Sequence, residues 1–60
     1  MPVRQVRAIL REKFGARKYR ITATGEIHAY GPMPNASCEG WYLVGWIGHA
    51  ETEARLRDWL

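Results

Sequence analysis

The chain has 60 residues, a net charge of +3 and a single cysteine, and these figures exclude several classes of protein. A chain this short forms one small domain, residues 1–60, that hides only about 60% of the surface its unfolded form exposes. Hydrophobic residues make up 47% of the chain, which argues against disorder. No apolar run approaches the ~20 residues of a bilayer-spanning helix, so no membrane partner is expected. With one cysteine, no disulfide forms within the chain, which fits a reducing cytoplasm.

Positive charge is concentrated at the start of the chain. Residues 1–20 carry seven lysines or arginines against one glutamate, whereas residues 21–60 carry two arginines against five acidic residues. A basic segment of this kind is typical of proteins that bind a polyanion. The alternative is a basic face that serves only solubility.

The first predicted element is a helix over residues ~2–14. Pro2 suits a first helical turn, and Gly15 is a typical C-terminal stop. An apolar stripe recurs at helical spacing, with Ile9 on its flank: Val3, Val6, Leu10 and Phe14. Three arginines follow a similar spacing beside the stripe and are predicted to form one ridge: Arg4, Arg7 and Arg11.

A β-hairpin is predicted next, over residues ~18–31, and its turn decides which side chains share a face. A two-residue turn would place Ile21 opposite His28, whereas a three-residue turn with Gly25 left-handed would place Ile21 opposite Ile27. We favour the second register because it gathers the apolar residues on one face. The other face then carries mainly polar and basic side chains: Lys18, Arg20, Thr22, His28 and Tyr30.

A loop over residues 31–40 leads to a strand over residues ~41–47 that is apolar on both faces. Pro32 and Pro34 are expected to prevent regular pairing in the loop. Within the strand, Gly45 indicates a bulge or a close approach by another backbone. Simple alternation puts Trp41 on one face and the pair Tyr42 and Trp46 on the other, and the sequence leaves open which face is buried.

A second helix is predicted over residues ~50–60, with His49 at its start. Its outer side carries two i, i+4 pairs, Glu51–Arg55 and Glu53–Arg57. Its inner side is predicted to carry Thr52, Leu56, Trp59 and Leu60. The predicted fold is therefore α+β, in the order α-β-β-β-α, with both helices on one face of a three-stranded antiparallel sheet. Because two short helices cover only one face, the other is left for a partner.

Basic side chains interleaved with aromatic rings on an open sheet suit phosphate contacts combined with packing against sugars or bases. We therefore predict a non-enzymatic nucleic-acid-binding protein with an accessory or regulatory role, and duplex DNA as the favoured partner. The alternative is an adaptor or inhibitor whose aromatic sheet face docks on another protein or on its own copy. The predicted phosphate contacts are Arg4, Arg7, Arg11, Arg17, Lys18 and Arg20, and the predicted sugar or base contacts are His28, Tyr30 and Trp46.

Two families share parts of this layout. The order α-β-β-β-α resembles double-stranded RNA-binding domains, although their second helix opens with a lysine-rich run and this one opens with "AETEAR". The stretch from "KYRITATGEIHAYG" through "GWYLVGWIGHAETEARLRDWL" is similar in layout to the arm-type DNA-binding domains of tyrosine recombinases. That resemblance implies DNA bound by the sheet, with Arg20, His28 and Tyr30 near the groove.

The sequence offers little for catalysis. His28 lies mid-strand with Glu26 on the same face, a pattern that suits a general base. Small mRNA-cleaving toxins use one histidine on a similar frame, but in a Gly-Ser-His-type motif, and "GEIHAY" lacks the serine. The set His28, Cys38 and His49 lacks metal-ligand spacing, and no glycine-rich phosphate loop is present. We therefore predict no catalytic residue, no metal site and no cofactor, and no role for Cys38.

Overall fold

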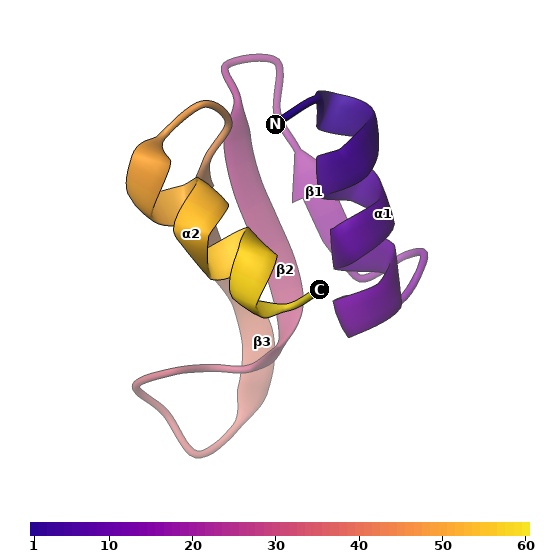
Figure 1. The fold of residues 1–60 in the computed structure, drawn as a ribbon. Helices are drawn as coiled ribbons and strands as arrows, with labels where there is room; N and C mark the ends of the chain where they lie inside the picture. Colours follow the sequence, from indigo (N-terminus) through magenta and orange to yellow (C-terminus); the bar gives the residue numbers. More distant parts are fainter.

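The two helices lie side by side on one face of a three-stranded antiparallel sheet, whose strand order is β1-β2-β3 (Figure 1). This arrangement confirms the predicted α-β-β-β-α order and the α+β class. The computed structural model describes residues 1–60 as helix α1 (Val3–Phe14), strands β1 (Tyr19–Ile21), β2 (Glu26–Pro32) and β3 (Glu39–Trp46), and helix α2 (Ala50–Asp58).

Helix α1 supplies much of the hydrophobic core, which also includes buried residues of β2, β3 and α2. Pro2 precedes the helix as its N-cap, in an extended conformation, instead of forming its first turn. Gly15 ends the helix as predicted, with φ +112° and its N–H donated to the Arg11 carbonyl. The prediction for Val3 is wrong, because the core is centred one turn later and leaves this side chain 42% exposed. The buried residues of α1 are Val6, Ile9 and Leu10.

The hairpin has the predicted three-residue turn. Ile21 lies opposite Ile27, and Gly25 adopts φ +89°. The register therefore directs Ile27 and Ala29 toward the helices, where both are fully buried. Their neighbours His28 and Tyr30 lie on the open face, as the hydrophobic pattern indicated.

The second hairpin is longer than predicted, because β2 and β3 continue pairing until Pro32 lies opposite Glu39. Pro32 was expected to prevent this pairing, but its nitrogen points away from β3, so the lack of an N–H does not disturb the hydrogen bonds between β2 and β3. The Tyr30 N–H donates toward β1, to the Lys18 carbonyl. Alternation points the Pro32 nitrogen the same way, beyond the start of β1, so no ladder hydrogen bond is lost.

A β-bulge in β3 determines which of its side chains are covered. Ile27 lies opposite Gly45 and His28 opposite Leu43, so Val44 is an extra residue. Val44 and Gly45 are both buried against the helices. The bulge changes the alternation, and neither face assignment made by simple alternation is correct. Tyr42 packs against the core, whereas the open face carries Trp41, Leu43 and Trp46.

Helix α2 approaches β3 at Gly45, and the contact is with a side chain rather than another backbone. The Trp46 N–H donates to Thr52 Oγ1 at 3.1 Å, and Thr52 is only 5% exposed. Leu56, one turn later, is buried in the core. Leu60 lies beyond the end of the helix and is 77% exposed, so its predicted place on the inner side is wrong.

Polar contacts of α2 differ from the predicted pattern in one pair. Glu53 and Arg57 form their i, i+4 pair at 3.6 Å, but Glu51 and Arg55 do not pair. Arg55 instead donates to the Val44 carbonyl at 2.8 Å, which satisfies a backbone group at the bulge. His49 is the N-cap residue, but its side chain makes no capping hydrogen bond.

Replacing Gly45 by alanine is expected to destabilise the fold, because the added Cβ would lie 2.2 Å from Thr52 Oγ1 and 3.0 Å from Thr52 Cβ. We expect a loss of about 1–3 kcal/mol in the free energy of unfolding, measured by urea denaturation. In the Gly45→Ala background, Thr52→Ala should lower the free energy of unfolding less than it does in the wild type, because it removes much of the clash between the added Cβ and the Thr52 side chain. Additive effects of the two substitutions would contradict this contact.

Glu53 is expected to contribute to the acid sensitivity of the fold. A hydrogen bond from the Met1 ammonium, 2.8 Å away, holds the pKa of Glu53 below its ordinary value of 4.5. Desolvation of the carboxylate raises this pKa, whereas electrostatic attraction to the ammonium and to Arg57 lowers it further. This stability is present at neutral pH and is lost as the pH falls through the lowered pKa. The urea midpoint of unfolding should therefore fall less between pH 7 and pH 3 in Glu53→Gln than in the wild type. In Glu51→Gln it should fall as much as in the wild type. Equal acid sensitivity of the two variants would contradict this role.

Candidate nucleic-acid interface

The face of the sheet opposite the helices is covered by no other part of the chain (Figure 1). Lys18, just before β1, and Arg20 of β1 contribute positive charge to it, β2 contributes aromatic and polar side chains, and β3 contributes large apolar ones. The exposed fraction is 41% for Trp41, 44% for Leu43 and 41% for Trp46, which is high for residues of this size. We call this surface the open face; it carries the basic, aromatic and apolar residues Lys18, Arg20, His28, Tyr30, Trp41, Leu43 and Trp46, together with Thr22, Glu26 and Glu39.

Four of these side chains form a continuous series of contacts across all three strands. Lys18 Nζ lies 4.5 Å from the centroid of the Tyr30 ring. The Tyr30 and Trp41 rings meet edge to face, with their centroids 5.7 Å apart. The Arg20 guanidinium carbon lies 4.8 Å from the centroid of the Trp41 ring. We call Lys18, Arg20, Tyr30 and Trp41 the cation–aromatic cluster, and it presents positive charge and ring surface together.

His28 lies next to this cluster and completes a small hollow on the open face. The hollow has a volume of about 230 Å³ and is lined by Arg20, Thr22, His28 and Trp41. His28 Nε2 lies 3.2 Å from Glu26 Oε1, and both side chains are partly exposed. This carboxylate–imidazole contact orients the His28 ring, and Glu26 supplies negative charge at the hairpin-turn end of the open face.

Trp46 stands apart from the cation–aromatic cluster, at the opposite end of β3 from Trp41. Its ring is 5.3 Å from that of His49, with an interplanar angle of 32°. Its cross-strand neighbour is Glu26. The surroundings of Trp46 are therefore aromatic but not cationic, which is less suited to a phosphate-bearing ligand than the surroundings of Trp41.

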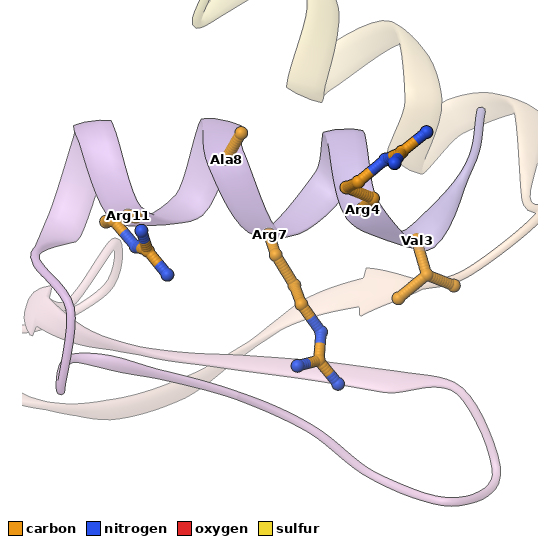
Figure 2. Close-up of a pocket in the computed structure, with 5 residues that line it drawn as sticks. All are labelled: Val3, Arg4, Arg7, Ala8 and Arg11. Carbon is orange, nitrogen blue, oxygen red and sulfur yellow. The ribbon is translucent and has the colours of Figure 1, made fainter.

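The predicted arginine ridge does lie on one exposed side of α1. Arg4, Arg7 and Arg11 line a shallow hollow of about 520 Å³ together with Val3 and Ala8. Figure 2 shows their guanidinium groups well apart from one another: in this view Arg7 and Arg11 point below the helix, and Arg4 points above it, toward α2. Each is exposed, and none forms a salt bridge. We keep the name arginine ridge for Arg4, Arg7 and Arg11.

The predicted binding residues therefore fall on two layers of the molecule. The open face holds Lys18, Arg20, His28, Tyr30 and Trp46, whereas the arginine ridge lies in the helical layer on the other side of the sheet. Arg17 lies in the turn that joins the layers and is exposed. Trp41 was not among the predicted contacts, although it is central to the cluster. Simple alternation left Trp41 as one of two choices for this face, and Gly45 signalled the bulge that brings Trp41 and Trp46 to the same face.

Other chemistry has little support in the geometry. No group of three His, Cys, Asp or Glu side chains is placed to hold a metal ion. Cys38 is a free, exposed thiol in the loop between β2 and β3. Neither helix has the length and apolar content that crossing a membrane requires.

Comparison of the chain with known protein families, with curated proteins and with solved structures found no match.

Substitutions on the two sides of β3 are expected to differ in their effect on stability. Trp41→Thr removes an exposed ring and keeps a β-branched residue in the strand, so we expect a change within about 1 kcal/mol. Tyr42→Thr removes a ring that packs against Phe14, 6.3 Å away between centroids, and should cost about 2 kcal/mol or more. Urea denaturation of both variants measures the difference. A greater loss for Trp41→Thr would mean that the face assignment is wrong.

Proposed function

We propose that this protein binds nucleic acid through its open face, with duplex DNA as the favoured partner, in a non-enzymatic accessory or regulatory role. The observation that carries the proposal is the cation–aromatic cluster. Lys18 and Arg20 supply contacts to phosphate, while Tyr30 and Trp41 supply ring surface for sugars and bases. His28 adds a polar group at the side of the same hollow.

The dimensions of the sheet support a groove contact. Three strands spaced about 4.8 Å apart extend about 10 Å from β1 to β3. The major groove of B-DNA is about 12 Å wide and admits β-structures as well as helices. A sheet that enters the groove with its open face forward brings Tyr30 and Trp41 toward sugars and bases, and Lys18 and Arg20 toward the phosphates at the groove edge.

A second candidate function is supported by the β3 side of the open face. Leu43 and Trp46 are exposed, and no lysine or arginine lies over the Trp46 ring. β3 is an edge strand, and the hydrogen-bond alternation directs the backbone groups of Trp41 and Leu43 away from β2. An apolar edge of this kind suits a protein partner or a second copy, which would add a strand to the sheet.

Neutralising the cations of the cluster is expected to weaken DNA binding specifically. Lys18→Gln/Arg20→Gln should lower the affinity for duplex DNA at least tenfold at about 100 mM salt, because both side chains are assigned to phosphate. It should also reduce the slope of log affinity against log salt by about one for each phosphate that the variant no longer neutralises. Fluorescence anisotropy with a mixed-sequence duplex and with a single strand of the same sequence measures both quantities.

The matched control removes the same charge elsewhere. Lys13 and Arg57 are exposed cations of α1 and α2, so Lys13→Gln/Arg57→Gln lowers the net charge equally and removes no side chain of the open face. Lys13 lines a hollow together with Lys18 and Tyr30, so this control also shows whether a cation beside the cluster is enough. Equal losses in the two double variants would contradict a site on the open face. Salt-insensitive or absent DNA binding, together with a dimeric mass in solution, would favour the second candidate. Tighter binding of the single strand would make stacking, rather than groove insertion, the mode of contact.

A further inference from the structure

The arginine ridge is the largest concentration of unpaired positive charge away from the open face. The salt bridges of the structure involve Glu53 and Glu26, and neither carboxylate contacts the ridge. Glu12 is the single acid of α1, and it follows Arg11 by one residue, about 100° further around the helix. Three exposed guanidinium groups without a carboxylate partner form a site for an anion with several charged groups.

The ridge and the cation–aromatic cluster belong to different layers of the molecule, so we expect a straight duplex seated on the open face to leave the ridge free. The open face lies on one side of the sheet, and α1 lies on the other side, with its buried residues against the sheet and its arginines exposed. The molecule extends only 31 Å in its longest direction. Duplex DNA has a persistence length of about 50 nm, so it does not wrap around a body of this size without a large bending cost.

We propose that the arginine ridge binds the backbone of a second DNA segment, so that one protein molecule bridges two duplexes. The inference rests on the proposed function, because the first duplex occupies the open face. The well-separated guanidinium groups in Figure 2 suit contacts to separate phosphates rather than the reading of one base pair. Val3 and Ala8 give the hollow a small apolar floor, which leaves the arginines free to reach the ligand. The second contact is therefore independent of DNA sequence.

A capture experiment tests bridging directly. A biotinylated duplex on beads is saturated with protein, washed, and offered a fluorescent duplex of unrelated sequence at about 50 mM salt. The wild type should retain the fluorescent duplex. Arg7→Gln/Arg11→Gln should retain at least fivefold less, while its affinity for a single duplex stays within about threefold of that of Lys13→Gln/Arg57→Gln. This control has the same net charge and should retain the fluorescent duplex.

Each result separates bridging from simple DNA binding. If the wild type binds the immobilised duplex and captures no second one, the bridging role is overturned and the proposed function stands. If Arg7→Gln/Arg11→Gln captures as much as the control, self-association of the protein and not the ridge holds the second duplex, and the bridging role is again overturned. If the wild type binds no duplex, the proposed function fails and the bridging role fails with it. Circular dichroism of each variant confirms that it remains folded.

Discussion

The contact between Thr52 and Gly45 organises this protein, because it fixes how β3 meets α2. Only a glycine admits the Thr52 side chain at this position, and the Trp46 N–H then donates to its hydroxyl. The extra residue of the bulge, Val44, is held by Arg55, which donates to its carbonyl. Two side chains of α2 thus satisfy backbone groups that a regular ladder would leave unpaired at the sheet edge. The remainder of β3 follows from this arrangement, including the exposure of Trp41 and Trp46 on one face.

The bulge also explains how far sequence reasoning could reach. Element order and the end of α1 follow from local rules, such as the helix stop at Gly15, and the hairpin register follows from the hydrophobic pattern of its two strands. Local rules do not determine which side chains of β3 are buried, because the strand is apolar on both faces and its hydrophobic periodicity favours neither. Gly45 signalled an irregularity, but its consequence depends on Thr52, which belongs to a different element. The same tertiary contact decides that Trp41 belongs to the candidate site and that Tyr42 does not.

The basic residues at the start of the chain lie on two different layers of the folded protein, and only one of these layers places aromatic rings beside them. Seven of the nine basic residues lie within the first 20 residues, yet folding places them on α1, on the following turn and on β1. Tyr19 and Ile21 pack against the core, so alternation along the strand places Lys18 and Arg20 on the far side of the sheet from Arg4, Arg7 and Arg11. A continuous basic segment therefore becomes two cationic surfaces of different character. One has aromatic neighbours and the other does not.

The cationic surfaces also differ in what holds their side chains. Lys18 and Arg20 lie over the rings of Tyr30 and Trp41, which limits their motion and reduces the conformational entropy that binding would cost. Arg4, Arg7 and Arg11 have neither a ring nor a carboxylate beside them, so fewer contacts restrict their side chains. Ordered cations beside rings favour a contact with defined geometry, whereas mobile cations favour a contact that tolerates any backbone position. On the proposed function, a small domain with one surface of each kind would bind one DNA segment in a fixed orientation and hold another loosely.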